Sequence, residues 1–383
     1  MSMDVVWFAE IKWDYLRTRK QQIVRRRPQD VRVLYLEPYV RGRENRFDLR
    51  EVDGIGVATV PFVKAVPGGP ARPLVDLAWV RRAIDARALA RVRRLSRAAG
   101  MPAAGAAAVL SNVYAVAVAR RFGARALVYD CNDAHGDFPG MPSWTHRYFE
   151  DACRAAQAVF VSARALGESV EAVRGGSAGV ETIGNGVEFA HFDAARRASG
   201  PGGGARVRVG YVGAIAPWLD VALLARVARE RPDWEVVLVG PQMLGVDLSA
   251  LRGLDNVVLQ PPVAYEDVPR VLHGFTLGVI PFRRDALTRG VNPNKMYEYL
   301  AMGLPVVATD FSHEVTRYPD VVRAAGGEDD FLRACDDFAA LRADGERAGA
   351  FSERAAATAA RHDWAEIAAR FWSRLRALAE PTG

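Results

Sequence analysis

Short runs rich in β-branched residues alternate with helix-length stretches along most of this chain, and this alternation is the feature that most restricts its fold. Strands separated by helices pair in parallel through right-handed crossovers, and helices then cover both faces of the sheet. The sequence therefore predicts a doubly wound α/β architecture. The expected strands are Val5–Ala9, Val31–Glu37, Gly56–Pro61, Ala107–Ser111, Ala126–Asp130, Ala158–Ser162 and Val180–Ile183, then Val207–Gly213, Glu235–Val239, Val257–Gln260, Leu277–Pro281 and Pro305–Thr309.

The strands fall into two series, separated by a break in composition with a glycine cluster at 202–204. A chain of 383 residues is too long for one core and suits two domains of ordinary size. We expect a first domain over 1–186, a linker over 187–205, a second domain over 206–362 and a C-terminal crossover helix over 363–383. Ligands of such sheets bind at the carboxyl ends of the strands, so we expect a cleft there between the domains.

Several classes of protein do not fit this sequence. No apolar run approaches the roughly 20 residues that cross a bilayer, and the chain starts in a strand without a signal peptide. A cytoplasmic protein is therefore expected. The three cysteines are scattered and odd in number, and the histidines lack metal-ligand spacing, so no disulfide framework and no metal site is expected.

The positive charge is concentrated in the first half, where residues 1–190 hold 28 Lys and Arg against 20 Asp and Glu. One basic run, WVRRAIDARALARVRRLSR, places Val80, Ile84, Ala88 and Leu95 on one helical face. Its arginines form either a solvated face or a patch that contacts anionic lipid or an anionic acceptor. Nucleic acid is not an expected partner, because no nucleic-acid motif accompanies the charge.

The segment Asn292–Asp310, NPNKMYEYLAMGLPVVATD, is the strongest candidate for a binding site. It reads as a polar loop, a short helix, a Gly-Leu-Pro turn and a buried strand. Free N–H groups at a helix start, together with a lysine (Lys295), favour a phosphate. Glu298 follows one turn later, within reach of hydroxyls attached to that phosphate. A ligand that carries both a phosphate and a vicinal diol is typically a nucleotide, so the segment indicates a nucleotide site.

The preceding loop, PFRRDALTRGVNPNK, adds arginines that suit a diphosphate, although it could also be a charged surface loop. A glycine that ends the strand Val207–Gly213 would let the backbone approach the same ligand. The expected donor-binding residues are Gly213, Arg283, Thr288, Arg289, Asn292, Lys295 and Glu298.

Polar residues also follow two strands of the first domain. Trp13 and Asp14 follow the first strand, and Asp130 ends a later one with Asp133 and His135 close behind. We expect Trp13, Asp14 and Asp130 on the acceptor side, and Asp133 and His135, with Lys295, among the catalytic groups. His135 could equally be a structural or surface histidine.

Several segments together resemble the retaining GT-B glycosyltransferases of family four, in particular the bacterial cell-surface polysaccharide branch that includes teichuronic acid biosynthesis transferases. The resemblance rests on VYDCNDAHGDFPG, FEDACRAAQAVFVSARAL, IGNGVEFAHF, GYVGAIAPWLD, the IPF strand end and NPNKMYEYLAMGLPVVATD. It implies two Rossmann-like domains facing across a cleft, with C-terminal helices packing back toward the first domain.

The resemblance also implies roles for single residues. Glu298 matches the second acid of the family's Glu-x-seven-Glu motif, which holds the ribose hydroxyls. The first acid falls on Gly290, a departure that leaves its role to Asn292 or Thr288. The Arg and Lys that normally neutralise the diphosphate are replaced by Ala214 and Leu219, so that role passes to Lys295 with Arg283 or Arg289.

These expectations describe a metal-independent hexosyltransferase that needs no cofactor. Its donor would be a UDP- or GDP-linked sugar and its acceptor a hydroxyl of a glycan or lipid-linked molecule, with retention at the anomeric carbon. Contact with anionic membrane through the basic first domain would place it at the inner face of the plasma membrane. Two alternatives stay open: a nucleotide-sugar epimerase that uses Asp130 and Asp133, and a non-catalytic nucleotide-binding protein.

Overall fold

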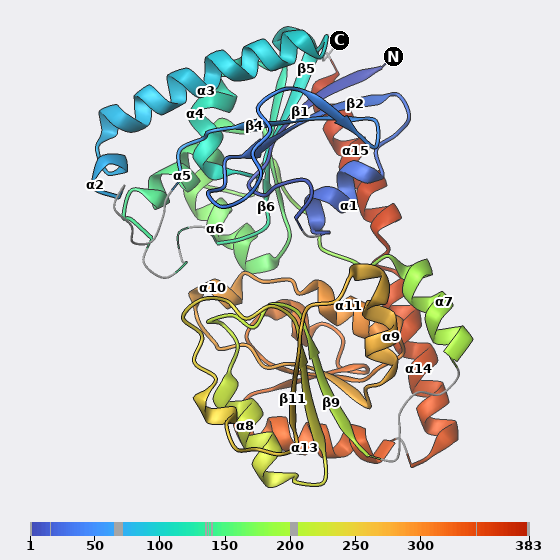
Figure 1. The fold of residues 1–383 in the computed structure, drawn as a ribbon. Helices are drawn as coiled ribbons and strands as arrows, with labels where there is room; N and C mark the ends of the chain where they lie inside the picture. Colours follow the sequence, from blue (N-terminus) through green and yellow to red (C-terminus); the bar gives the residue numbers. More distant parts are fainter. Residues whose placement is uncertain are drawn as a thin grey trace. The chain divides into compact units, whose positions relative to one another are not determined.

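The computed structural model describes residues 2–15, 17–64, 72–134, 136, 138, 141–199, 206–341 and 343–380. The chain forms two compact units (Figure 1). The first contains the residues up to Gly184 together with the chain from Ala365 on, and the second is Asn185–Trp364. Each unit has its own sheet and its own apolar core, as the two series of strands predict.

The first sheet has the strand order β3-β4-β2-β1-β5-β6-β7-β8 and is parallel apart from the β3–β4 pair. Val5 of β1 pairs with Val33 on one side and Ala107 on the other, so the strand order reverses between β1 and β5. The edge strand β3 was not expected. It forms a hairpin with β4 through Asp53 and Gly54, which both have positive φ. The strands are β1 (Met3–Phe8), β2 (Val31–Pro38), β3 (Arg50–Val52), β4 (Ile55–Val60), β5 (Ala106–Leu110), β6 (Ala126–Cys131), β7 (Ala158–Val161) and β8 (Val180–Thr182).

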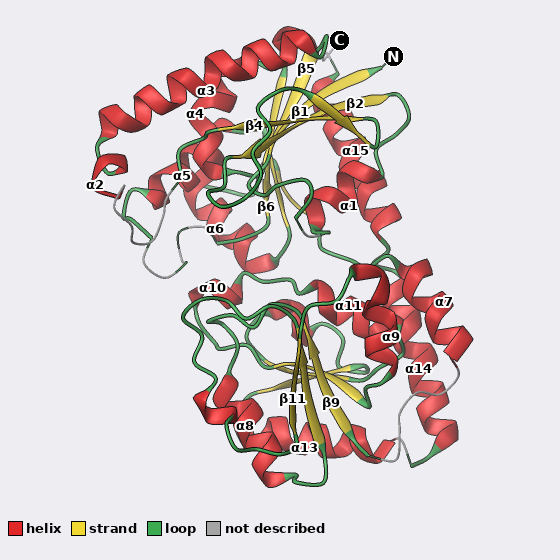
Figure 2. Cartoon of the chain, in the orientation of Figure 1, coloured by secondary structure: helices red, strands yellow, loops and turns green. Residues whose placement is uncertain are grey.

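Helices cover both faces of this sheet (Figure 2). On one face, α3 and its neighbours bury an aliphatic cluster against β1, β2 and β5. On the other, Phe371 of α15 stacks on Trp7 of β1 at 5.4 Å between ring centroids, and Trp372 donates to the Ile23 carbonyl of α1. The helices are α1 (Arg19–Arg25), α2 (Arg72–Val75), α3 (Ala78–Ala98), α4 (Val116–Phe122), α5 (Thr145–Ala155), α6 (Arg164–Arg174) and α15 (Trp364–Ala379).

The second sheet is parallel throughout, with the order β11-β10-β9-β12-β13-β14. This is the doubly wound order in which the direction of winding reverses between β9 and β12. The strands are β9 (Arg208–Val212), β10 (Glu235–Val239), β11 (Val257–Gln260), β12 (Leu277–Ile280), β13 (Val306–Thr309) and β14 (Val322–Ala325). The helices are α7 (Phe189–Ser199), α8 (Val221–Glu230), α9 (Val268–His273), α10 (Ala286–Arg289), α11 (Asn294–Ala301), α12 (His313–Thr316), α13 (Glu328–Leu341) and α14 (Gly345–Ala360).

The region between the two expected domains differs from the expectation. The stretch 187–205, expected as a linker, carries α7, which packs on α9 and α11 inside the second unit. The reason is the apolar face of α7, where Phe192 is fully buried against Tyr265. The glycine cluster at 202–204 lies outside the described residues. Helix α15 belongs to the first unit from Ala365 on, whereas α13 and α14 belong to the second unit.

The buried face of α3 is also shifted from the expected one. Ala88 and Leu95 are buried as expected, whereas Val80 and Ile84 are only half-buried. Leu89 and Val92 complete the buried stripe at helical spacing. The arginines at 82, 87, 93, 94 and 97 are exposed.

Candidate functional site

The carboxyl ends of β9 and β12 lie side by side where the second sheet reverses its winding. Doubly wound sheets bind their ligands at this position. Gly213 follows β9 with φ +139°, and Phe282 follows β12. The start of α11 reaches the same place, because the side chain of its Lys295 lies against Gly213. A Cβ on Gly213 would come within 3.1 Å of the Lys295 Nζ, so a side chain there would displace the lysine.

The Lys295 ammonium lies at this strand end, and among the described residues it forms no ion pair. Its Nζ lies 5.0 Å from the ring centroids of both Tyr211 and Phe282. Burial lowers the pKa of the Lys295 ammonium to about 8, and the neighbouring Glu298 opposes this shift. In the described part of the chain, no carboxylate lies within ion-pair distance of Lys295. A partly desolvated cation that lies against two aromatic rings and has no ion-pair partner among the described residues is a favourable place for an anionic ligand.

The start of α11 adds hydrogen-bond donors to that cation. The helix begins after Pro293, whose side chain cannot accept from the first-turn N–H groups. The Met296 N–H donates to the Pro293 carbonyl, which leaves the N–H groups of Asn294 and Lys295 for a ligand. These two groups and the positive end of the helix dipole favour a negatively charged group. The Asn292 carbonyl, just before the helix, accepts from Asn185 Nδ2 at 2.8 Å and fixes the approach of the chain. Asn292 itself is buried.

Glu298 lies one turn after Lys295 on α11 and is half-buried. Burial raises the pKa of its carboxyl to about 7. The positive charge of Lys295 lowers this pKa in part, and the negative charge of Glu188 raises it further. Its carboxyl oxygens accept no hydrogen bond from any residue that the structure describes. A recessed carboxyl of this kind can accept hydrogen bonds from two adjacent hydroxyls.

The arginines of the loop before α11 divide into two groups. Arg284 is occupied, since it pairs with Asp310 and donates to the Ala325 carbonyl. Arg283 and Arg289 are exposed and have no ion-pair partner among the described residues. Of the three arginines in this loop, Arg283 and Arg289 can therefore move to a ligand without breaking an ion pair with any described residue.

The Thr288 hydroxyl, expected at the donor, is used within its own loop in this structure. Its side chain is buried, donates to the Arg283 carbonyl at 2.5 Å and forms a capping box with Asp285 at the start of α10. These contacts use its hydroxyl inside the loop, so Thr288 shapes the loop and cannot offer that hydroxyl to a donor. Gly290, where the resemblance expects an acid, ends α10.

The described residues expected at the strand ends of the first unit have different surroundings. Asp130 is fully buried and pairs with Arg19 at 2.9 Å, which makes it a structural residue. Trp13 is buried as well, and its backbone N–H donates to Glu37. The Asp133 carboxylate accepts from Asn132 at 2.5 Å. His135 lies outside the described residues.

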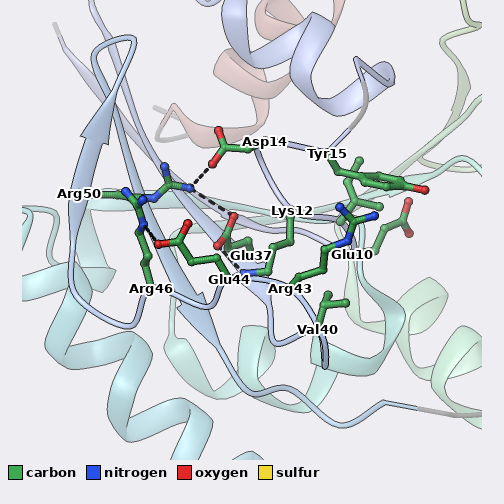
Figure 3. Close-up of a pocket in the computed structure, with 11 residues that line it drawn as sticks. Glu10, Lys12, Asp14, Tyr15, Glu37, Val40, Arg43, Glu44, Arg46 and Arg50 are labelled. Carbon is green, nitrogen blue, oxygen red and sulfur yellow. Dashed lines mark hydrogen bonds and ion pairs between the residues drawn. The ribbon is translucent and has the colours of Figure 1, made fainter. Parts of the chain in front are cut away.

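Asp14 belongs to a pocket of about 400 Å³ beyond the carboxyl ends of β1 and β2 (Figure 3). Lys12 and Tyr15 contribute from the loop after β1, and Arg43 and Arg46 from the loop after β2. Sequence reasoning missed these four residues, because neither loop carries a motif. The available signal was the density of charge in 41–50, RGRENRFDLR.

The described residues were also compared with the requirements of a metal site and of a membrane-spanning helix. Among them, no group of three His, Cys, Asp or Glu side chains is arranged to hold a metal ion. None of the helices in the described ranges combines the length and the apolar character needed to cross a membrane.

Comparison with known proteins gives matches in sequence and in fold. Residues 206–344 match the family model for glycosyl transferases group 1. Over 165 residues the chain is 32% identical to a Bacillus subtilis protein named as a teichuronic acid biosynthesis glycosyltransferase. That alignment covers 41% of this chain and 42% of the relative, so it spans less than half the length of the curated protein.

Solved structures match nearly the whole chain. Anabaena HepE in complex with UDP and glucose has a TM-score of 0.67 at 15% identity and covers 98% of this chain and 100% of its own. Sucrose-phosphate synthase from Thermosynechococcus elongatus has a TM-score of 0.70 at 13% identity, over 98% and 99% of the two chains. An E. coli structure with bound UDP-2-fluoro glucose has a TM-score of 0.70 at 10% identity over the same shares. At these identities the likeness establishes the GT-B fold that the sequence predicts.

Proposed function

We propose that this GT-B protein is a glycosyltransferase that moves a hexosyl group from a nucleoside diphosphate sugar to a hydroxyl of a glycan or lipid-linked acceptor. The observation that carries the proposal is the pair formed by Lys295 and Glu298 on α11. Within the described ranges Lys295 has no carboxylate at ion-pair distance, and Glu298 is a half-buried carboxyl one turn away that interacts with it only at longer range. A diphosphate next to a ribose diol matches that arrangement. The match of residues 206–344 to glycosyl transferases group 1 supports the same assignment.

In the proposed reaction the bond between the anomeric carbon and the diphosphate oxygen breaks, and the acceptor oxygen forms the new bond to that carbon. The acceptor hydroxyl loses its proton, and the diphosphate leaves with the bonding electron pair. Lys295 and the N–H groups at the start of α11 would stabilise the growing charge on the diphosphate, which is usually the largest catalytic contribution. Arg283 and Arg289 are close enough in sequence to assist. Retention at the anomeric carbon is an expectation from the family resemblance.

Two features support the details of the donor. The usual cations after β9 are replaced by Ala214 and Leu219, yet Lys295 brings its ammonium back to Gly213 at the end of that strand. This substitution supports a site that neutralises the diphosphate with side chains and needs no metal. The GT-B structures with UDP or UDP-linked ligands make UDP the first nucleotide to test. The teichuronic acid relative favours a cell-surface polysaccharide as the product.

The epimerase alternative loses its main support. It required Asp130 and Asp133 as an acid–base pair, but Asp130 is buried in an ion pair with Arg19. The non-catalytic alternative keeps one argument, the glycine at position 290 where the family carries an acid.

A panel of UDP-, GDP- and dTDP-linked sugars tests the proposed function. The matching donor should raise the melting temperature, since a ligand at about 100 times its Kd adds about 2.7 kcal/mol to the unfolding free energy. It should also be hydrolysed slowly without an acceptor. Isomerised sugar would indicate an epimerase instead. Binding without any turnover, with or without acceptor, would indicate the non-catalytic protein.

We also propose that the first unit contacts an anionic membrane at the start of α3. Leu74, Leu77 and Trp79 are 59%, 42% and 67% exposed, which is unusual for three large apolar side chains so close in sequence. Exposed arginines of α3 follow directly, among them Arg82 and Arg87. Exposed Trp and Leu beside arginines suit an interface with anionic head groups. Such contact would place the protein at the inner face of the plasma membrane, near a lipid-linked acceptor.

Replacing both Leu77 and Trp79 with alanine should lower binding to phosphatidylcholine vesicles that contain phosphatidylserine by about tenfold or more, because each side chain would bury apolar surface on insertion. Vesicle co-sedimentation measures the change. Leu244→Ala is the matched control, because Leu244 is a fully exposed leucine of the second unit. Equal loss of binding in both variants, or none in either, would contradict the proposed membrane contact.

A further inference from the structure

The pocket of the first unit has a rigid floor built around Glu37 (Figure 3). Glu37 is almost fully buried, and its two carboxyl oxygens are saturated. One oxygen accepts from Lys12 at 2.9 Å and Thr59 at 2.8 Å. The other accepts from the Trp13 N–H at 3.0 Å and lies 3.7 Å from Arg50. Glu37 therefore fixes the basic side chains around it and has no capacity left for a ligand.

The other acidic side chains that line the pocket also have basic partners. Each forms an ion pair with a lysine or arginine, so the pocket offers no unneutralised carboxylate. These pairs are Asp14 with Arg50 at 2.7 Å, Glu44 with Arg46 at 2.6 Å, and Glu10 with Lys20.

Three basic side chains of the pocket retain hydrogen-bond donors that are not used by described residues. Arg43 has no carboxylate partner among the described residues; its guanidinium lies 5.4 Å from the centroid of the Tyr15 ring. The Nε–H of Arg50 is buried and has no acceptor in the described part of the chain. Lys12 uses two of its three N–H groups, on Glu37 and Thr59. The pocket is therefore matched to a ligand rich in acceptor oxygens that carries negative charge.

An aromatic face completes the pocket. Tyr15 is 52% exposed, and Figure 3 shows its ring beside the Arg43 head group. An exposed ring next to hydrogen-bonding side chains suits the C–H face of a pyranose, which is apolar on its face and polar at its rim. A volume of about 400 Å³ accommodates a sugar unit, since ligand pockets start near 300 Å³.

From these contacts we infer that the pocket binds a sugar unit that carries an anionic group, a carboxylate or a phosphate ester, with Arg43 and the Arg50 Nε–H on the anion and Tyr15 on the sugar face. The assignment of this sugar as the acceptor rests on the proposed transfer reaction. The binding of the sugar does not rest on it, because all residues that line the pocket lie in the first structural unit.

The test measures binding of sodium glucuronate, glucose 6-phosphate and glucose to the full chain by ligand-observed NMR or calorimetry. The Lys295→Met variant serves as the background, so that the second unit does not capture the phosphate. At least one anionic sugar should bind about tenfold more tightly than glucose, because a charge-assisted hydrogen bond is lost with the neutral sugar. Comparison of the affinities for glucuronate and for glucose 6-phosphate shows whether the pocket prefers a carboxylate or a phosphate ester.

Two variants locate the binding. Arg43→Ala should abolish the roughly tenfold higher affinity for the anionic sugar. Tyr15→Ala should lower the affinities for glucose and for the anionic sugar by a similar factor. Arg41→Ala is the matched control, because Arg41 is exposed on the same loop and does not line the pocket. An intact preference in Arg43→Ala, equal affinity for glucose, or no anionic sugar bound at about 10 mM would overturn the inference. A failed transfer function would appear separately, as absence of UDP binding to the unmodified chain.

Discussion

Replacing Lys295 with methionine should lower the rate of donor cleavage by about 100-fold to 1,000-fold and weaken UDP binding by about tenfold or more. Lys295 supplies a half-buried cation at the end of β9, and Ala214 and Leu219 leave no other cation directly after that strand. Loss of one group that stabilises a developing oxyanion usually costs this much. Calorimetry with UDP and a donor-hydrolysis assay measure the two effects.

The stability of the same variant serves as a control. Burial of the Lys295 ammonium works against its charge, as its lowered pKa indicates, and methionine keeps an unbranched stem against Tyr211 and Phe282. The melting temperature should therefore stay the same or rise, as is common when a strained functional group is removed. Arg252→Ala, at an exposed position of the same unit, should change neither binding nor turnover. Full activity in Lys295→Met would remove the lysine from the mechanism.

The pH dependence of binding gives a second readout for Lys295. The folded-state pKa of this group is lowered to about 8, so the ammonium is charged below pH 8 and is lost as the pH rises through that value. Affinity for UDP-glucose, whose diphosphate does not titrate in this range, should therefore fall above about pH 8. The Lys295→Met variant should lack this inflection.

Glu298→Ala should weaken binding of UDP by about tenfold to 100-fold and leave binding of inorganic pyrophosphate nearly unchanged. The carboxyl would accept from two ribose hydroxyls, and hydrogen bonds to a charged group contribute about 1.5–3 kcal/mol. Pyrophosphate has no ribose, so only the Lys295 variant should weaken its binding. Calorimetry on both variants with both ligands separates recognition of the diol from recognition of the diphosphate.

A matched control comes from another acid on a helix of the same unit. Glu346 lies in the first turn of α14 and is exposed, so Glu346→Ala should bind UDP normally. Glu366 would not serve as this control, because it lies outside that unit. If Glu298→Ala weakened UDP and pyrophosphate equally, the carboxyl would act on the anion site and not on a diol. Unchanged UDP affinity would exclude Glu298 from the nucleotide site.

The fold was predictable because it rests on local patterns. Strands β10 and β11 match their expected bounds, since both are short apolar runs between turn signals, although only β10 is buried. Two strands escaped detection. β3 reads REV, too short and too polar for a buried strand, and β14 reads VRAA before two glycines.

The candidate site was predictable where charge and helix starts are visible in the sequence, as for Lys295 and Glu298. It was not predictable where partners come from distant segments. Asp130 has the pattern of a strand-end acid, but Arg19, 111 residues earlier, neutralises it. Thr288 has the pattern of a ligand, but its own loop uses its hydroxyl. The pocket of the first unit combines two loops that carry no motif, and only the tertiary structure brings Arg43 to Tyr15.

The central claim is that the carboxyl ends of β9 and β12, with α11, hold a nucleoside diphosphate. A crystal structure of the protein with UDP tests it most directly. The expected result places Lys295 Nζ within about 3 Å of a phosphate oxygen and the Glu298 carboxyl at similar distance from the ribose hydroxyls. UDP bound with both side chains out of reach would contradict it.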